Sequence, residues 1–90
     1  MAEKKRLIEF YGTECKVCKE MEPFLERLKK EEKVKIEKLE VWHNTKNAEL
    51  LRQYDKGHCG GVPFYYNTGT GKWICGAATY TQFKKWALDK

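Results

Sequence analysis

The chain has 90 residues, of which 41% are hydrophobic and 13% aromatic, and its formal net charge is +5 at pH 7. This length allows one domain with a modest core, so we treat residues 1–90 as a single domain and exclude a disordered chain. The basic residues are interspersed with acids and form no patch with exposed aromatics, which argues against nucleic-acid binding.

The first half of the chain predicts a strand, a helix and a second strand. Residues 7–11 alternate and carry β-formers, and residues 15–31 have an apolar stripe at helical spacing. Pro23 lies inside this helix, and we expect the helix to bend there because proline removes a backbone hydrogen bond. Residues 33–42 predict the second strand. Its apolar residues change phase midway, which indicates either a bulge or a lysine-rich edge strand.

The second half predicts a helix, a hairpin and a last helix. Asn44 or Thr45 can cap a helix that runs to about Tyr54 and turns Ala48, Leu51 and Leu50 inward. A loop at 56–61 leads to strands at 62–66 and 72–75, and Thr79 or Thr81 begins the last helix. The order β-α-β-α-β-β-α predicts an α/β fold, with one four-stranded mixed sheet and helices on both faces.

Two cysteines stand at the predicted start of the first helix, in Cys15-Lys16-Val17-Cys18. The unpaired backbone N–H groups and the dipole at a helix start favour negative charge there. A thiolate is therefore stabilised at Cys15, and the thiolate is the reactive form of cysteine. Strand, Cys-x-x-Cys and helix in this order predict a redox site rather than two packed thiols.

Glu9 lies inside the first predicted strand. A carboxyl in a central strand is costly unless it is paired or serves as an acid. If Glu9 lies beneath the cysteines, burial raises its pKa toward neutrality, and it can accept a proton from Cys18. The alternative is an exposed glutamate on an edge strand.

The other two cysteines, Cys59 and Cys75, leave three alternatives open. They pack as small apolar residues, which we favour slightly, or they form a second, regulatory disulfide. Otherwise they join Cys15 and Cys18 as zinc ligands, although a spacing of sixteen residues lacks the two close pairs of a strong zinc motif. A zinc-binding or redox-sensing interaction module that uses all four cysteines is therefore the alternative to an enzyme.

Five segments together resemble the thioredoxin-like superfamily, in particular its small thioredoxin- and glutaredoxin-like proteins. The resemblance covers nearly the whole chain, and Cys-x-x-Cys-Lys with a proline five residues after the second cysteine is its most specific part. The segments are Glu9-Phe10-Tyr11, Cys15-Lys16-Val17-Cys18-Lys19-x-Met21-x-Pro23, Lys38-Leu39-x-Val41, Gly61-Val62-Pro63 and Cys75-Gly76.

The resemblance implies a minimal thioredoxin fold and a thiol–disulfide oxidoreductase that acts as a protein-disulfide reductase. Cys15 looks like the exposed nucleophile and Cys18 like the buried thiol that resolves the mixed disulfide. Glu9 is similar to a buried acid that donates and accepts protons, and Lys38 to the lysine that partners it. These four residues are the catalytic candidates.

The resemblance also implies where a substrate binds. Pro63 is similar to a cis-proline beside the disulfide, Val62 supplies backbone next to it, and Gly76 is similar to a glycine that faces the substrate. Tyr11 is a further substrate-binding candidate, because it can frame a hydrophobic docking face with other aromatics, although core packing is the commoner role for such residues. Those aromatics are Trp42, Phe64 and Trp73.

For partners, the resemblance implies protein disulfide substrates and a reductase or a small thiol as the electron donor, with neither cofactor nor metal. We expect a monomer in the cytoplasm, with a role in electron transport and no membrane or nucleic-acid partner. The N-terminal residues contain no long apolar leader, and no segment is apolar enough to span a membrane.

The chain departs from the family pattern at several points. The N-terminal strand and helix that thioredoxins usually add are absent, and Glu9 stands where an aspartate is expected. Glu14-Cys15-Lys16-Val17-Cys18 replaces Trp-Cys-Gly-Pro-Cys, and Ala77-Ala78-Thr79 replaces the acidic motif of glutaredoxins. The sequence therefore leaves the redox potential and the electron donor open.

Overall fold

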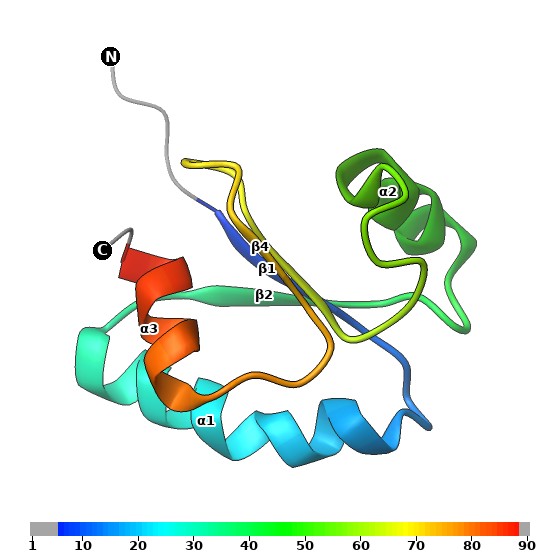
Figure 1. The fold of residues 1–90 in the computed structure, drawn as a ribbon. Helices are drawn as coiled ribbons and strands as arrows, with labels where there is room; N and C mark the ends of the chain where they lie inside the picture. The colour runs from blue at the N-terminus through cyan, green and yellow to red at the C-terminus, as the bar shows by residue number, and fades with distance from the viewer. Residues whose placement is uncertain (1–5, 89–90) are drawn as a thin grey trace.

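Seven helices and strands follow one another along residues 6–88, the part of the chain that the computed structural model describes (Figure 1). Their order is the predicted β-α-β-α-β-β-α. Residues 1–5, which belong to the N-terminal segment expected to contain no long apolar leader, lie outside the described residues. The elements are β1 (Leu7–Tyr11), α1 (Lys16–Glu32), β2 (Ile36–Glu40), α2 (Thr45–Asp55), β3 (Phe64–Asn67), β4 (Trp73–Cys75) and α3 (Tyr80–Leu88).

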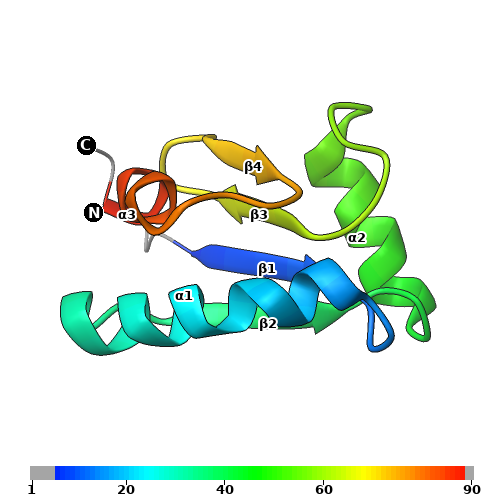
Figure 2. The ribbon, with the colours of Figure 1, turned by 60° about the horizontal axis from the view of Figure 1, so that its bottom comes forward.

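The strands form one mixed sheet in the order β2-β1-β3-β4 (Figure 2). Strand β1 pairs with β2 in parallel and with β3 antiparallel, and β3 pairs with β4 antiparallel. These pairings confirm the predicted four-stranded sheet. They also make β1 a central strand, which excludes an exposed edge position for Glu9.

Side chains alternate across β1 and divide the core into two layers. Leu7 packs with α1 and α3 on one face of the sheet, whereas Ile8 and Phe10 pack with α2 on the other. Figure 1 shows α1 and α3 on one side of the sheet and α2 on the other. Helices on both faces, as predicted, leave the central strand covered on each side. Glu9 shares the α1 face with Leu7, because residues two apart on a strand point the same way.

Two predicted strands have different limits in the structure. β2 is shorter than 33–42, and its register with β1 runs one to one from Leu7↔Ile36 to Tyr11↔Glu40. The bulge is therefore wrong and the edge strand is confirmed. β3 begins at Phe64 rather than at residue 62, because Pro63 has no N–H to donate to a ladder.

Side-chain caps define the helix starts. Asn44 accepts a hydrogen bond from the Asn47 N–H at the start of α2. At α3, the Thr79 hydroxyl accepts from the Gln82 N–H and the Gln82 side chain accepts from the Thr79 N–H, so Thr79 rather than Thr81 is the cap.

Helix α1 passes through Pro23 as a single helix, and the bend expected there stays a prediction. Ala48, Leu50 and Leu51 of α2 pack against the core on its face of the sheet, as expected. Among residues 6–88, no helix has both the length and the apolar character needed to cross a bilayer.

Candidate active site

The two cysteines of the Cys-x-x-Cys segment form a disulfide at the start of α1, just after the loop that follows β1. Cys15 is the N-cap of α1, and its sulfur accepts a hydrogen bond from the Cys18 N–H at 3.1 Å. The Cα atoms of the bonded pair are 5.3 Å apart. The predicted placement at the positive end of a helix is confirmed, and in the reduced form the same N–H group and dipole would stabilise a Cys15 thiolate.

Cys15 is buried like Cys18, so the exposed position that the resemblance implied for Cys15 is wrong in this oxidised form. Cys15 is 6% exposed and Cys18 is 2% exposed. The reason is local, because the Cys15 side chain folds back over the first turn of α1 to reach both the Cys18 sulfur and the Cys18 N–H.

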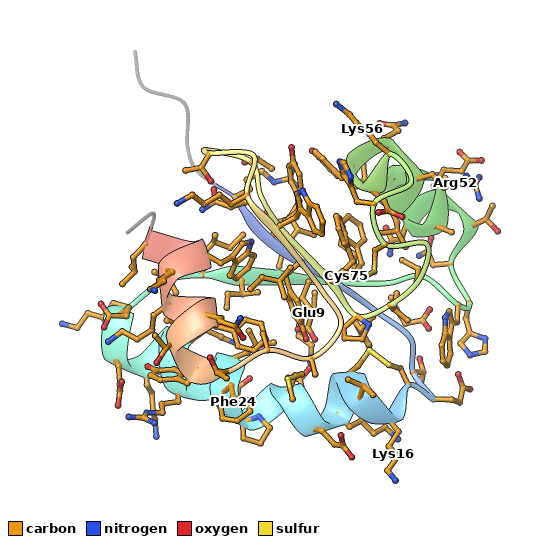
Figure 3. All side chains as sticks on the ribbon, in the orientation of Figure 1. Glu9, Lys16, Phe24, Arg52, Lys56 and Cys75 are labelled. Atoms are coloured by element: carbon orange, nitrogen blue, oxygen red, sulfur yellow. A yellow bond between two sulfur atoms is a disulfide. The ribbon has the colours of Figure 1, made fainter. Side chains whose placement is uncertain are left out.

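Glu9 is buried in the centre of the sheet, with only 1% of its surface exposed. Its strand neighbour Tyr65 packs in the layer formed with α1 and α3, and Figure 3 shows the Glu9 side chain between the sheet and α1. Cys18 and Met21 are one helical turn apart on α1, and both are on its buried face. The resolving thiol therefore belongs to the same layer as Glu9. Burial raises the pKa of Glu9 to about 8, and the nearby Glu22 charge adds to the shift.

Lys38 lies opposite Glu9 in the β1–β2 register, but the structure pairs it with another carboxylate. Its ammonium is 3.0 Å from the Glu22 carboxylate and lies over the Tyr11 ring, 5.1 Å from the centroid. Lys38 therefore acts on Glu9 through its charge alone, which lowers the pKa of Glu9. The direct partner that the resemblance implied is replaced by an ion pair with Glu22, a residue that the sequence analysis did not single out.

Three residues were expected to bind the substrate backbone or to face it, and all three lie at one end of the β3–β4 strand pair. Val62–Pro63 is a cis peptide, and the Gly76 N–H donates to the Pro63 carbonyl at 2.8 Å. Gly76 has a φ of 81°, which favours glycine over residues with a Cβ. The start of β3 lies opposite the end of β1, so the chain enters α1 and its disulfide at this same end of the sheet.

The aromatic candidates for a docking face divide between surface and core. Phe64 is fully buried, whereas Trp42 and Trp73 are among the exposed large hydrophobic residues. Tyr11 is half-buried beneath Lys38. The expected aromatic face is thus reduced to separate side chains, and Phe64 takes the core role.

Cys59 and Cys75 form a second disulfide, with Cα atoms 5.5 Å apart. Our preference for two packed free thiols was wrong. The bond joins the segment after α2 to the end of β4, next to Gly76 (Figure 3). All four cysteines are used in disulfides, and residues 6–88 contain no group of three potential metal ligands, so the zinc alternative is not supported.

The sequence analysis missed the contacts that hold the loop before α1. The Glu40 carboxylate accepts hydrogen bonds from the N–H groups of Thr13 and His43. The His43 ring pairs with Glu14 at 2.8 Å, and this hydrogen bond raises the pKa of His43. Glu40 is the last residue of β2, inside the strand expected at 33–42, and nothing in its sequence neighbourhood marks it as an acceptor for a loop 27 residues away.

Comparison with known proteins agrees with this geometry. The family model described as Thioredoxin matches residues 1–87. The chain belongs to the thioredoxin family. Its fold is similar to that of oxidised mitochondrial thioredoxin 3 from Saccharomyces cerevisiae, with a TM-score of 0.64 and 22% identity over 96% of this chain and 78% of that one. None of the curated proteins compared with the chain matches it.

The thioredoxin family, the fold and the Cys15–Cys18 disulfide together support thiol–disulfide oxidoreductase chemistry.

Proposed function

We propose that the chain is a protein-disulfide reductase whose Cys15–Cys18 pair passes two electrons to disulfides in other proteins. The observation that carries this proposal is the Cys15 sulfur at the N-cap of α1, held by the Cys18 N–H and within bonding distance of Cys18. A pair in this position can alternate between dithiol and disulfide without moving the rest of the fold.

In the first step the Cys15 thiolate attacks a substrate disulfide. A bond forms between the Cys15 sulfur and one substrate sulfur, and the second substrate sulfur leaves as a thiolate that takes a proton from water. The extended substrate chain is proposed to lie along the backbone at Val62 and Pro63, with Gly76 facing it and Tyr11 at the border of the site.

In the second step Cys18 resolves the mixed disulfide. The Cys18 thiol gives its proton to Glu9, and the Cys18 sulfur attacks the Cys15 sulfur and expels the remaining substrate thiolate. The protein is left oxidised, with the Cys15–Cys18 disulfide seen in the structure. The second substrate thiolate also takes a proton from water, so the substrate has gained two electrons and two protons. A reductase or a small thiol is proposed to restore the dithiol form.

Reduction of insulin by dithiothreitol tests the proposal. The wild-type chain is expected to accelerate the precipitation of insulin chains, and the Cys15→Ser variant is expected to give the rate of dithiothreitol alone. The double variant Cys59→Ser/Cys75→Ser is the matched control, because it removes the other disulfide and keeps the Cys15–Cys18 pair. Loss of activity in the control with retention in Cys15→Ser would move the active centre to the second disulfide.

The reduction potential of the Cys15–Cys18 couple decides the direction of electron flow. A reduction potential of about −270 mV fits a reductant, whereas one of about −120 mV fits a protein that introduces disulfides. The measurement is best made in the Cys59→Ser/Cys75→Ser background, so that a single couple titrates.

A cytoplasmic location remains part of the proposal and has its own test. Cys75 is exposed, and cytosolic thiols keep accessible cysteines reduced. Acid quenching and alkylation of the protein in its own cells is expected to find Cys59 and Cys75 as thiols if the chain works in a reducing cytosol. Recovery of the pair as a disulfide from intact cells would contradict that location.

A further inference from the structure

The carboxyl of Glu9 is surrounded by charged and titratable groups from three elements. The charges of Glu22 and Lys29 act on it from α1 and that of Lys38 from β2, and Tyr65 of β3 is its partner in the sheet register. Tyr65 keeps its proton, because burial first and the charges of Glu9 and Glu22 next raise its pKa. Glu22, Lys29 and Lys38 are therefore the charges that act on Glu9, and Glu22 is the only carboxylate among the groups named.

Glu22 holds Lys38 as its own partner. The Glu22 carboxylate is 3.0 Å from the Lys38 ammonium, and the two side chains are 27% and 39% exposed. The Tyr11 ring lies under the same ammonium. These two contacts direct the Lys38 charge to the partly exposed Glu22 rather than to the buried Glu9.

The hydrogen bonding of Glu9 depends on whether it carries a proton. As a carboxylate it has no hydrogen-bond donor within the described chain for either of its oxygens. As a neutral acid it can donate a hydrogen bond to the nearby Glu22 carboxylate, which is one cause of its raised pKa. Burial without a donor disfavours the charged form, and the bond to Glu22 favours the neutral form, so both effects hold a proton on Glu9.

We propose that Glu22 is a positioning residue for Glu9, because it withdraws Lys38 from the Glu9 carboxyl and accepts the Glu9 proton on its way to solvent. This inference rests on the proposed function, in which Glu9 exchanges a proton with Cys18. When Cys18 attacks the Cys15 sulfur, its proton passes to Glu9 in those molecules in which Glu9 is ionised. From there the neighbouring Glu22 carboxylate, whose side chain is 27% exposed, passes it to water.

The pKa of Glu9, raised to about 8, agrees with this arrangement. Burial is the largest cause, and the charge and hydrogen bond of Glu22 follow, while the charges of Lys38 and Lys29 act in the opposite direction. Without the Glu22 carboxylate, the neutral form loses its acceptor and Lys38 is free to turn to Glu9. Both changes favour the ionised form of Glu9 and lower its pKa.

The first test is a carboxyl ¹³C NMR titration of the fully oxidised protein, which measures Glu9 without any turnover. Glu22→Gln is expected to lower the Glu9 midpoint by about one to two pH units. Glu22→Asp keeps the charge but draws it back by one methylene, so a smaller shift in the same direction is expected. Glu20→Gln, an exposed substitution two positions before Glu22 on α1, is the matched control and is expected to leave the midpoint unchanged.

A Glu9 midpoint that stays at its wild-type value in both Glu22 variants overturns the proposal. The double variant Glu22→Gln/Lys38→Gln separates the two effects, since any shift that remains in it is due to the lost hydrogen bond and charge of Glu22 alone. If Glu22→Gln does not fold, as judged by circular dichroism, the titration of Glu22→Asp decides alone.

The second test measures the pH dependence of kcat/KM for reduction of a protein disulfide. The midpoint of this profile is expected to move to lower pH in Glu22→Gln by the same amount as the Glu9 midpoint in the titration. Agreement supports the positioning role, and an unmoved profile alongside a shifted titration overturns it. The oxidised-state titration stands by itself if the wild-type chain proves inactive, so failure of the proposed function is recognised separately.

Discussion

At the scale of single residues, Glu9 serves the proposed proton transfer at a cost to the stability of the fold. A carboxyl in a central strand, without a donor for its charged form, destabilises the folded state whenever it ionises. The same isolation raises the pKa of Glu9 to about 8, close to the range in which it can exchange protons with a cysteine. We therefore expect the cost of Glu9 to appear in the pH dependence of stability.

The pKa of Glu9 is about 8 in the folded protein against an ordinary value of 4.5. Between these values the folded state binds more protons than the unfolded state, so the free energy of unfolding falls as pH rises and levels off above pH 8. Below pH 4.5 Glu9 is neutral in both states and carries no such cost. The Glu9→Gln variant should gain stability relative to wild type between pH 5 and pH 9, by about 1.4 kcal/mol for each unit of pKa shift.

Urea unfolding of the oxidised proteins at pH 5, 7 and 9 measures this difference. Glu20→Gln, an exposed substitution on α1, is the control and should follow wild type at every pH. A constant difference between Glu9→Gln and wild type across the three pH values would show that Glu9 titrates normally.

The sequence made Glu9 predictable but not Glu22. Glu9 stands between apolar neighbours on a short strand, so its burial follows from the strand itself. Glu22 lies on a helix with many charges, where most carboxylates face solvent, and its partner Lys38 is sixteen positions further along the chain. Only the packing of α1 against the edge of the sheet brings these two residues together.

At the scale of elements, the segment between α2 and β3 depends on two restraints. The Asp55 carboxylate at the end of α2 accepts hydrogen bonds from the N–H groups of Cys59 and Gly60. The Cys59–Cys75 bond then ties the segment to β4. Sequence spacing left Cys59 and Cys75 undecided, because the approach of two cysteines sixteen residues apart depends on the turn between β3 and β4 and on the path of the loop after α2.

Removal of the second disulfide should destabilise the fold. Cys59→Ser/Cys75→Ser is expected to lower the free energy of unfolding by about 3 kcal/mol, the cost associated with a closed loop of this length. Urea unfolding with the Cys15–Cys18 disulfide intact provides the measurement. In the complementary variant Cys15→Ser/Cys18→Ser, the lost loop is much shorter, so a smaller decrease is expected; equal losses in the two variants would contradict the loop-closure explanation.

The start of α3 offers a sharper comparison, since the sequence proposed two caps and the structure uses one. Thr79→Ala removes the hydroxyl that accepts the Gln82 N–H and should cost about 1 kcal/mol of stability. Thr81→Ala, two positions along and exposed, should change stability by less than about 0.5 kcal/mol. Thermal unfolding of the two variants at one pH distinguishes them. A larger loss of stability in Thr81→Ala would identify Thr81 as the cap instead.

At the scale of the whole molecule, the fold was predictable because local signals agreed with one another. Helical and strand periodicities alternate in the order that a mixed sheet with a parallel first pair requires, and β1 is apolar on the face toward α2. The limits of β2 and β3 were less predictable, since a strand ends where its neighbour stops offering hydrogen bonds. The pairing of β2 with β1 over five residues and the proline before Phe64 set those limits.

The surface of residues 6–88 bears on how the molecule behaves in solution. Its exposed large hydrophobic side chains, Val17, Trp42 and Trp73, come from three separate segments, and the chain carries a net charge of +5. Like-charged copies repel one another, and isolated apolar side chains do not supply the area that a stable dimer interface buries. We therefore expect a monomer.

Two measurements on the oxidised protein test this expectation. Light scattering should give a mass near 10.7 kDa across the concentration range. Small-angle X-ray scattering should give a radius of gyration slightly above the Cα value of 12.3 Å, which is close to the ~12 Å typical of a compact chain of this length. Trp42→Ser, which removes the most exposed of these side chains, should leave both values unchanged. A doubled mass in the wild type that returns to 10.7 kDa in this variant would instead identify Trp42 as the centre of a dimer contact.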